Sequence, residues 1–169
     1  MNTRKLTTMA LLSAIALTIY IIEAQIPSPI PIPGVKLGLS NIVTVYAVYA
    51  LGAKEGAAIL FVRIFLGAVF SGNFGSFFYS AAGGALAILT TIGLKFVLPE
   101  SQIWISSCLS AIAHSIGQMI VALWATGTPS FLIYLPVLIL CGIVAGLFTG
   151  LCAQLLVKRG KNLWKTIFR

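Results

Sequence analysis

The chain has 169 residues, of which 59% are hydrophobic and 8% are charged, whereas a soluble domain carries about 25% charged residues. This composition excludes an ordinary water-soluble protein and an intrinsically disordered chain. The sequence contains no Asp, three Glu and one His, so it lacks the parts for a paired-carboxylate site, a Ser-His-Asp triad or a His/Asp metal cluster. It also lacks a glycine-rich ATP-binding loop. We therefore expect no enzymatic activity, no metal and no cofactor.

The first predicted helix covers about residues 6–22 and follows Arg4 and Lys5. A cleaved signal peptide shares this basic start and apolar core, but the stretch 22–24 lacks the small residue that cleavage requires at position minus three, so a retained helix is expected. Residues 24–38 then carry four prolines at alternate positions, which exclude a helix and predict a stiff, extended loop. The residues between the prolines are mostly apolar, so we expect this loop to pack over another part of the protein.

Five further apolar segments follow, separated by short turns of glycine, proline and polar residues. We expect helices at about residues 39–51, 56–70, 77–97, 103–124 and 131–156, and a basic tail at 157–169. The segment 39–51 is short for a membrane span, but tilt and Gly38 extend it. The prediction is an all-α membrane protein in which six transmembrane helices form a single integral domain over residues 1–169.

Basic residues mark one side of this predicted domain. Six spans place both termini on the same side, and among the loop cations only Lys36 lies on the other side. Short loops rich in Lys and Arg stay in the cytoplasm, so both termini are expected to be cytoplasmic and the loop 24–38 to face outward. The basic residues are then anchors beside anionic lipid and not a groove for nucleic acid. The cations on the cytoplasmic side are Arg4, Lys5, Lys54, Lys95, Lys158, Arg159, Lys161, Lys165 and Arg169.

Small residues recur every four positions in two of the predicted helices. Ala10 and Ala14 share one helical face, and so do Gly142, Gly146 and Gly150. Such faces allow close approach of helix backbones in lipid. Internal packing explains both patterns, but Ala10 and Ala14 lie near the cytoplasmic end, where a membrane partner can also dock.

Arg63 lies near the middle of the predicted helix 56–70, where a charge in the membrane costs about 2.5–3.5 kcal/mol. It must therefore face the bundle interior or a wet cavity. No acidic residue lies at a comparable depth unless Glu23 reaches in from the outer end of the first helix. An Arg without an internal anion is a candidate for binding an anionic ligand, and the alternative is an Arg satisfied by helix carbonyls and water.

The helix 103–124 carries polar side chains on one face, at spacings of three and four residues. An interhelical hydrogen bond alone explains His114, but several polar groups in the outer half of one small bundle favour a binding site open to the outside. Tyr79 and Phe78 are candidates to stack on a ring of the ligand. The members of the stripe are Ser107, Ser110, His114 and Gln118. The full set of candidate ligand-binding residues is Arg63, His114, Gln118, Asn41, Tyr79, Asn73, Lys36 and Glu23.

Several runs of this sequence resemble a bacterial membrane family, the Gx transporter family, which is also labelled heptaprenyl diphosphate synthase component I. The runs are EAQIP at 23–27, PIPGVKLGLSNI at 31–42, RIFLG at 63–67, FSG at 70–72, YSAAGG at 79–84 and AHSIGQ at 113–118. That family is similar to the S-components of energy-coupling factor (ECF) vitamin transporters. The resemblance implies a six-helix bundle in the cell membrane, with an outward-facing pocket capped by the first loop.

The resemblance also implies partners: one transmembrane ECF coupling protein and two cytoplasmic ATPase subunits. S-components often dock through an Ala-xxx-Ala motif on the first helix, which Ala10 and Ala14 match. The expected function is capture of a small vitamin- or precursor-like molecule from outside, and Arg63, His114 and Lys36 suggest an anionic or carboxylated compound. The alternative is a membrane accessory for isoprenoid or quinone synthesis. Catalysis by this chain is rejected because prenyl synthases of the usual helical type hold magnesium through aspartate-rich motifs.

Overall fold

The computed structural model describes residues 3–26 and 38–167, and the side chains up to residue 160. Helices form all the regular structure of these two stretches, which confirms the predicted all-α class. In chain order they are α1 (Thr3–Gln25), α2 (Asn41–Ala50), α3 (Ala53–Ser71), α4 (Phe74–Val97), the 3-10 helix η1 (Glu100–Gln102), α5 (Ile103–Thr126), the 3-10 helix η2 (Pro129–Tyr134) and α6 (Leu135–Ile167). The predicted basic tail continues α6 as far as Ile167.

Four helical stretches are long and apolar enough to cross a membrane: Thr3–Gln25, Phe74–Val97, Glu100–Thr126 and Pro129–Gly160. The sequence predicted six spans. The helix α2 has 10 residues, which reach about 15 Å at 1.5 Å per residue, against a hydrocarbon core of about 30 Å. The helix α3 has 19 residues, among them three charged ones. Six complete spans and the cytoplasmic position of the termini therefore stay predictions.

The shortness of α2 follows from its place in the bundle. Seven of its ten residues are buried, because α1, α3, α4 and α6 all pack against it. On one side Val43 and Ala47 join an apolar cluster with Ala16 of α1, and further along Val48 packs with Leu60 of α3. A helix that is enclosed by its neighbours does not have to match the thickness of the bilayer.

Glycines set the turns and the closest helix contacts. Gly52 (φ 128°) and Gly127 (φ 62°) adopt left-handed backbone conformations beside α3 and after α5, which favour glycine over residues with a side chain. Along α6, an added Cβ would lie 2.8 Å from Cys108 Cα at Gly146 and 2.7 Å from Trp104 Cα at Gly150. The predicted glycine ladder is thus an internal contact between α6 and α5.

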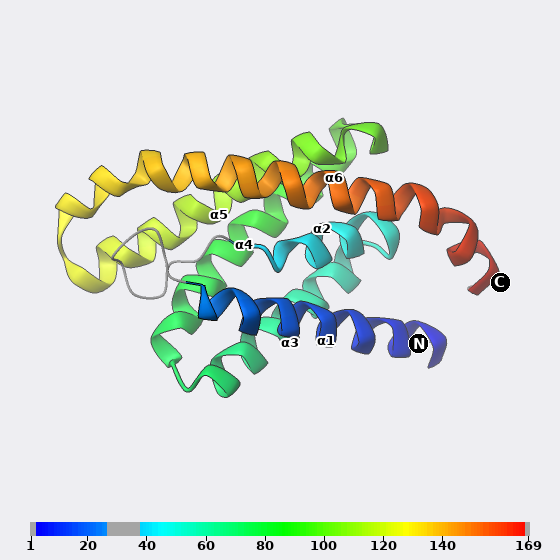
Figure 1. Ribbon diagram of the computed structural model, residues 1–169, viewed down its shortest axis with the longest axis horizontal. Helices are drawn as coiled ribbons and strands as arrows, with labels where there is room; N and C mark the ends of the chain where they lie inside the picture. Colours follow the sequence, from blue (N-terminus) through cyan, green and yellow to red (C-terminus); the bar gives the residue numbers. More distant parts are fainter. Residues whose placement is uncertain (1–2, 27–37, 168–169) are drawn as a thin grey trace.

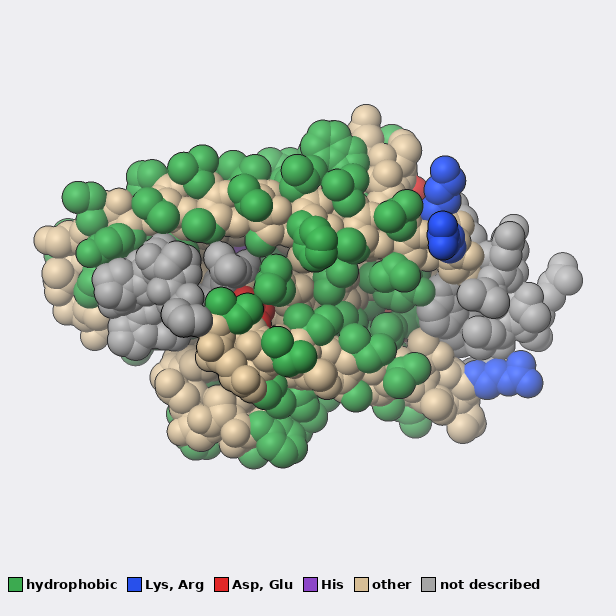
Figure 2. All heavy atoms as spheres, viewed as in Figure 1, with side chains coloured by type: hydrophobic (Ala, Val, Ile, Leu, Met, Phe, Trp, Pro, Cys, Tyr) green, Lys and Arg blue, Asp and Glu red, His purple; other side chains and the backbone are tan. Residues whose placement is uncertain are grey.

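The two chain ends lie at the same end of the molecule (Figure 1). Lys and Arg side chains gather at that end, while apolar side chains cover most of the visible length of the bundle (Figure 2). Large side chains on the outside include Phe61, Phe96 and Trp124, which are 67%, 84% and 80% exposed. A soluble protein does not leave such extensive apolar area in water, so the structure is that of a helical membrane protein.

Candidate functional site

The carboxylate of Glu23 joins the end of α1 to the start of α2. Glu23 is 5% exposed; its Oε1 accepts a hydrogen bond from the Gly38 backbone N–H at 2.5 Å, and its Oε2 accepts a longer one from the Ser40 N–H at 3.4 Å. Gly38 has φ 79°, a conformation suited to glycine. The acid therefore holds both ends of the proline-rich segment together, and residues 27–37 between those ends lie outside the described part.

Arg63 reaches the same place from α3. It is 2% exposed, and its Nη1 donates a hydrogen bond to the Ser40 hydroxyl. Its guanidinium carbon lies 5.9 Å from the centre of the Tyr20 ring, within the range of a cation–π contact. Glu23 does reach in towards Arg63, but Ser40 stands between them: the Ser40 N–H binds the acid and its hydroxyl binds the base.

Contacts with α3 and α4 fix the position of the Tyr20 ring beside Arg63. Its hydroxyl lies 2.8 Å from Ser76 Oγ of α4. Gly67 of α3 makes room for its ring, since a Cβ at that position would lie 2.7 Å from Tyr20 Cε1. The glycine of the RIFLG run is therefore needed for the packing of Tyr20 against α3.

His114 approaches this region from α5 and is 4% exposed. A Cβ on Gly83 of α4 would lie 2.8 Å from its Cε1, and one on Gly38 would lie 3.4 Å from its Cδ2. Gly38 is the residue that Glu23 binds, so the ring of His114 borders the same segment. Gln118, about one turn further along α5, is 1% exposed.

Four buried polar atoms in this region have no hydrogen-bond partner among the described residues: Asn41 Oδ1, Thr44 Oγ1, Arg63 Nε and Arg63 Nη2. Buried polar atoms without a partner are rare in native proteins, and each needs an explanation such as an ordered water or a bound group. We call the set Tyr20, Glu23, Ser40, Asn41, Thr44, Arg63 and His114 the Arg63 cluster. It combines a permanent charge with unused donors and acceptors, which is the chemistry of a binding site for a polar ligand.

A model of the heptaprenyl diphosphate synthase component I family matches residues 12–156. The chain belongs to that family. The match includes the whole Arg63 cluster and Ala14, whereas Ala10 and the basic end of α6 lie outside it. No curated protein and no solved structure matches the chain.

Of the eight ligand-binding residues that the sequence predicted in this family member, four meet in the Arg63 cluster: Glu23, Asn41, Arg63 and His114. Two others, Tyr79 and Asn73, make contacts within the bundle instead. Tyr79 is 8% exposed and packs in an apolar cluster with Met119 and Leu138.

Asn73, another predicted ligand-binding residue, is exposed and caps α4 by accepting the Ser76 N–H at 3.1 Å. Lys36 lies outside the described residues. Gln118 is buried and lies one helical turn from His114 on the same face of α5.

The first two residues of the predicted polar stripe, Ser107 and Ser110, form hydrogen bonds between helices. Ser107 Oγ lies 3.0 Å from Thr149 Oγ1 of α6, and Ser110 donates to the Ala87 carbonyl of α4 at 2.8 Å. Because these hydroxyls already have hydrogen-bond partners within the bundle, we do not count them among the ligand-binding groups. Among the described residues no three His, Cys, Asp or Glu side chains lie close enough together to hold a metal ion.

Sequence reasoning missed Tyr20, Ser40 and Thr44. Helical spacing contains the signal for two of them, because Tyr20 precedes the predicted Glu23 by three residues and Thr44 follows the predicted Asn41 by three. Ser40 lies directly before Asn41 in the run PIPGVKLGLSNI, so its proximity to the site was also readable.

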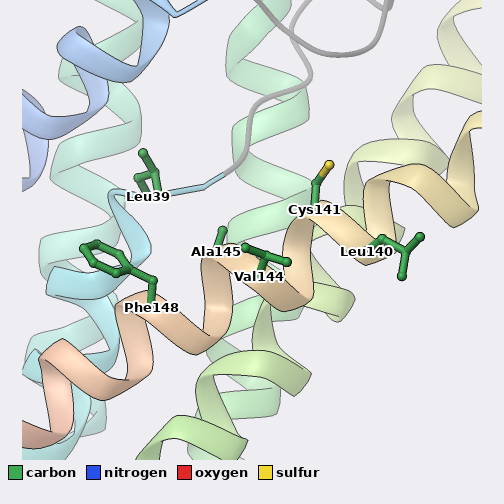
Figure 3. Close-up of a pocket in the computed structure, with 6 residues that line it drawn as sticks. All are labelled: Leu39, Leu140, Cys141, Val144, Ala145 and Phe148. Carbon is green, nitrogen blue, oxygen red and sulfur yellow. The ribbon is translucent and has the colours of Figure 1, made fainter.

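An apolar groove borders the Arg63 cluster on the side of α6. It has a volume of about 560 Å³ and is lined by Leu39, Leu140, Cys141, Val144, Ala145 and Phe148. In Figure 3, Leu39 comes from the turn that leads into α2, and the other five residues come from α6. Because Leu39 precedes Ser40 directly, the groove and the cluster lie on two sides of one short segment.

The surface of α1 offers a second candidate contact. Ala10 and Ala14 are exposed, together with Thr7 and Thr18, so small side chains form a stripe along the outside of this helix. Larger side chains flank it, among them Leu11 at 61% exposed. In contrast to the glycine ladder of α6, this stripe is not used by the described part of the bundle.

Proposed function

We propose that this protein is the substrate-binding membrane subunit of an ECF-type uptake transporter, and that it captures a small vitamin- or precursor-like molecule from outside. The observation that carries the proposal is the Arg63 cluster: a buried cation in an apolar bundle, with unpartnered donors, where the end of α1, the start of α2 and the middle of α3 meet. A charge in such a place is costly and is typical of a functional site.

The exposed stripe on α1 supports the second half of the proposal. Small residues allow another helix to approach closely, and close packing is a main attraction between helices in lipid. The chain has no ATP-binding loop of its own, so energy for uptake has to come from partners. We propose that a transmembrane coupling protein docks on Ala10 and Ala14 and that two cytoplasmic ATPase subunits complete the transporter.

A second candidate function comes from the printed description of the family, which names a component of heptaprenyl diphosphate synthase. We propose for this alternative a membrane accessory without catalytic residues, since the chain contains no Asp to build a magnesium site of the aspartate-rich type. Both candidates keep the chain in the cell membrane, and they differ in the partner protein and in the bound molecule.

Purification of the tagged protein from its own membranes in mild detergent tests the two candidates. The transporter proposal expects a coupling protein and two ATPases in the purified complex, and native mass spectrometry should show a small bound molecule. Recovery of a prenyl synthase without ATPases would support the accessory role and refute transport.

Substitution of the stripe tests the docking surface. Ala14→Trp should abolish the complex with the coupling protein, because the indole holds the two backbones apart. The matched control is Ala85→Trp, which places the same side chain on an exposed alanine of α4 and should leave the complex intact. If both variants keep their partners, the stripe on α1 is not the docking surface.

A further inference from the structure

One edge of the Arg63 guanidinium group is unused. Nη1 donates to Ser40, while Nε and Nη2 have no hydrogen-bond partner among the described residues. The Nε–H and one N–H of Nη2 point in parallel along the same edge of the planar group, and this pair matches two oxygens of one carboxylate or phosphate. Because Ser40 binds Nη1, it leaves both donors of the Nε/Nη2 edge available.

Burial makes the unused edge significant. Arg63 is 2% exposed, so bulk water does not solvate the two donors, and buried charged groups are stable only when they are paired and hydrogen-bonded. Ser40 and Thr44 lie four residues apart, on one face of α2. Ser40 contacts Arg63, the unpartnered Thr44 Oγ1 belongs to the residue one helical turn after Ser40, and the unpartnered Asn41 Oδ1 belongs to the residue directly after it.

The charges of the cluster restrict the kind of anion. Its described residues contain one guanidinium group and one carboxylate, and Glu23 already receives the N–H groups of Gly38 and Ser40. Because those N–H groups stabilise the charge of Glu23, Arg63 remains as the partner for one further negative charge. A dianionic phosphate would bring a second negative charge into an apolar bundle beside Glu23, where an unpaired charge is costly.

We propose that Arg63 binds a carboxylate of the ligand side-on through Nε and Nη2, and that the ligand is a small monocarboxylate with a neighbouring hydrogen-bond donor for Asn41 or Thr44. This inference rests on the proposed ligand-binding function and names the chemical class of the ligand. Lysine does not replace Arg63 in this arrangement, because its ammonium group lacks the two parallel donors. Ser40 is a positioning residue that holds the guanidinium plane.

The experiment uses the whole protein in nanodiscs with its arginines labelled at 15Nε. The chain has four arginines, and Arg63→Lys identifies the Arg63 Nε–H signal. Three probes of similar size are titrated at constant ionic strength: acetate, neutral acetamide and methyl phosphate. We expect acetate to shift the Arg63 signal saturably, acetamide to leave it in place, and methyl phosphate to bind at least tenfold more weakly than acetate.

Variants provide an independent measurement through the rise of melting temperature that acetate causes. Arg63→Lys should weaken acetate binding at least tenfold although it keeps the charge, and Ser40→Ala should weaken it several-fold. Ser107→Ala, which removes an equally buried hydroxyl between α5 and α6, is the control and should bind acetate normally.

A stronger response to methyl phosphate than to acetate would overturn the carboxylate assignment. The absence of a saturable shift with either anion would overturn the side-on site and would mean that water hydrates Nε and Nη2 of Arg63. Neither result depends on the coupling protein or the ATPases, so a failure of this inference is distinguishable from a failure of the proposed transport function.

Discussion

Replacement of Glu23 by glutamine tests whether this acid holds the start of α2. The variant keeps the size of the side chain and one acceptor oxygen, but it removes the negative charge that the Gly38 and Ser40 N–H groups share. Hydrogen bonds to a charged group contribute about 1.5–3 kcal/mol, and neutral ones about 0.5–1.5 kcal/mol.

The expected loss follows from these two contacts. The bond from Gly38, at 2.5 Å, changes from charged to neutral, which costs about 1–2 kcal/mol. The bond from Ser40, at 3.4 Å, is long and adds little. For a chain of this size, 1 kcal/mol corresponds to about 2–4 °C in melting temperature. Glu23→Gln should therefore melt about 2–8 °C below the parent protein.

The assay is thermal unfolding of the purified protein in one detergent at neutral pH. Glu55→Gln is the matched control, because Glu55 forms a partly exposed ion pair with Lys5, and ion pairs near the surface contribute about 0–1 kcal/mol. Equal melting temperatures for Glu23→Gln and Glu55→Gln, or a Glu23→Gln protein more stable than the parent, would refute the role of Glu23.

Three further predictions concern packing, topology and pH. Gly117→Ala should lower the melting temperature, since its Cβ would lie 2.7 Å from the Ala82 carbonyl oxygen, whereas Gly93→Ala, with nothing within 4 Å, should leave it unchanged or raise it; a stable Gly117→Ala protein would contradict the close α4–α5 contact. In a cysteine-free background, Asn73→Cys should react with an impermeant thiol reagent on intact cells and Lys161→Cys should not, and the reverse pattern would overturn the predicted orientation. The hydrogen bond from Lys5 lowers the pKa of Glu55, so this pair stabilises the fold at neutral pH and loses its contribution as the pH falls through that pKa; acid unfolding of Glu55→Gln should lack this small component.

The sequence was sufficient for the helical class, the glycine turns, the internal glycine ladder and the burial of Arg63. It was not sufficient for the depth of each helix. Apolar side chains face both the core and the lipid of a membrane protein, so hydrophobicity alone does not distinguish a helix that is enclosed by its neighbours, such as α2, from one that faces lipid. Tyr79 was predicted as a ligand-binding residue from its place near the outer end of α4 and from its ring, and in the structure it packs among apolar side chains.

Local hydrogen bonding explains the remaining differences. The sequence predicts Asn73 as a ligand-binding residue from its place at the outer end of α3, and in the structure its side chain caps α4. The role of Ser40 depends on the meeting of α1, α2 and α3 at one point, which no spacing within a single helix reveals. Arg63 was found because a charge inside an apolar segment is conspicuous whatever surrounds it.

The length of α6 has a mechanical consequence. Its 33 residues form one continuous helix, about 50 Å long at 1.5 Å per residue, and glycines bring its backbone close to that of α5. A rigid rod of this length acts as a lever: a tilt of about 10° at one end displaces the other end by about 9 Å. A small tilt at the start of α6, beside the apolar groove, would therefore produce a large displacement at the basic end of this helix.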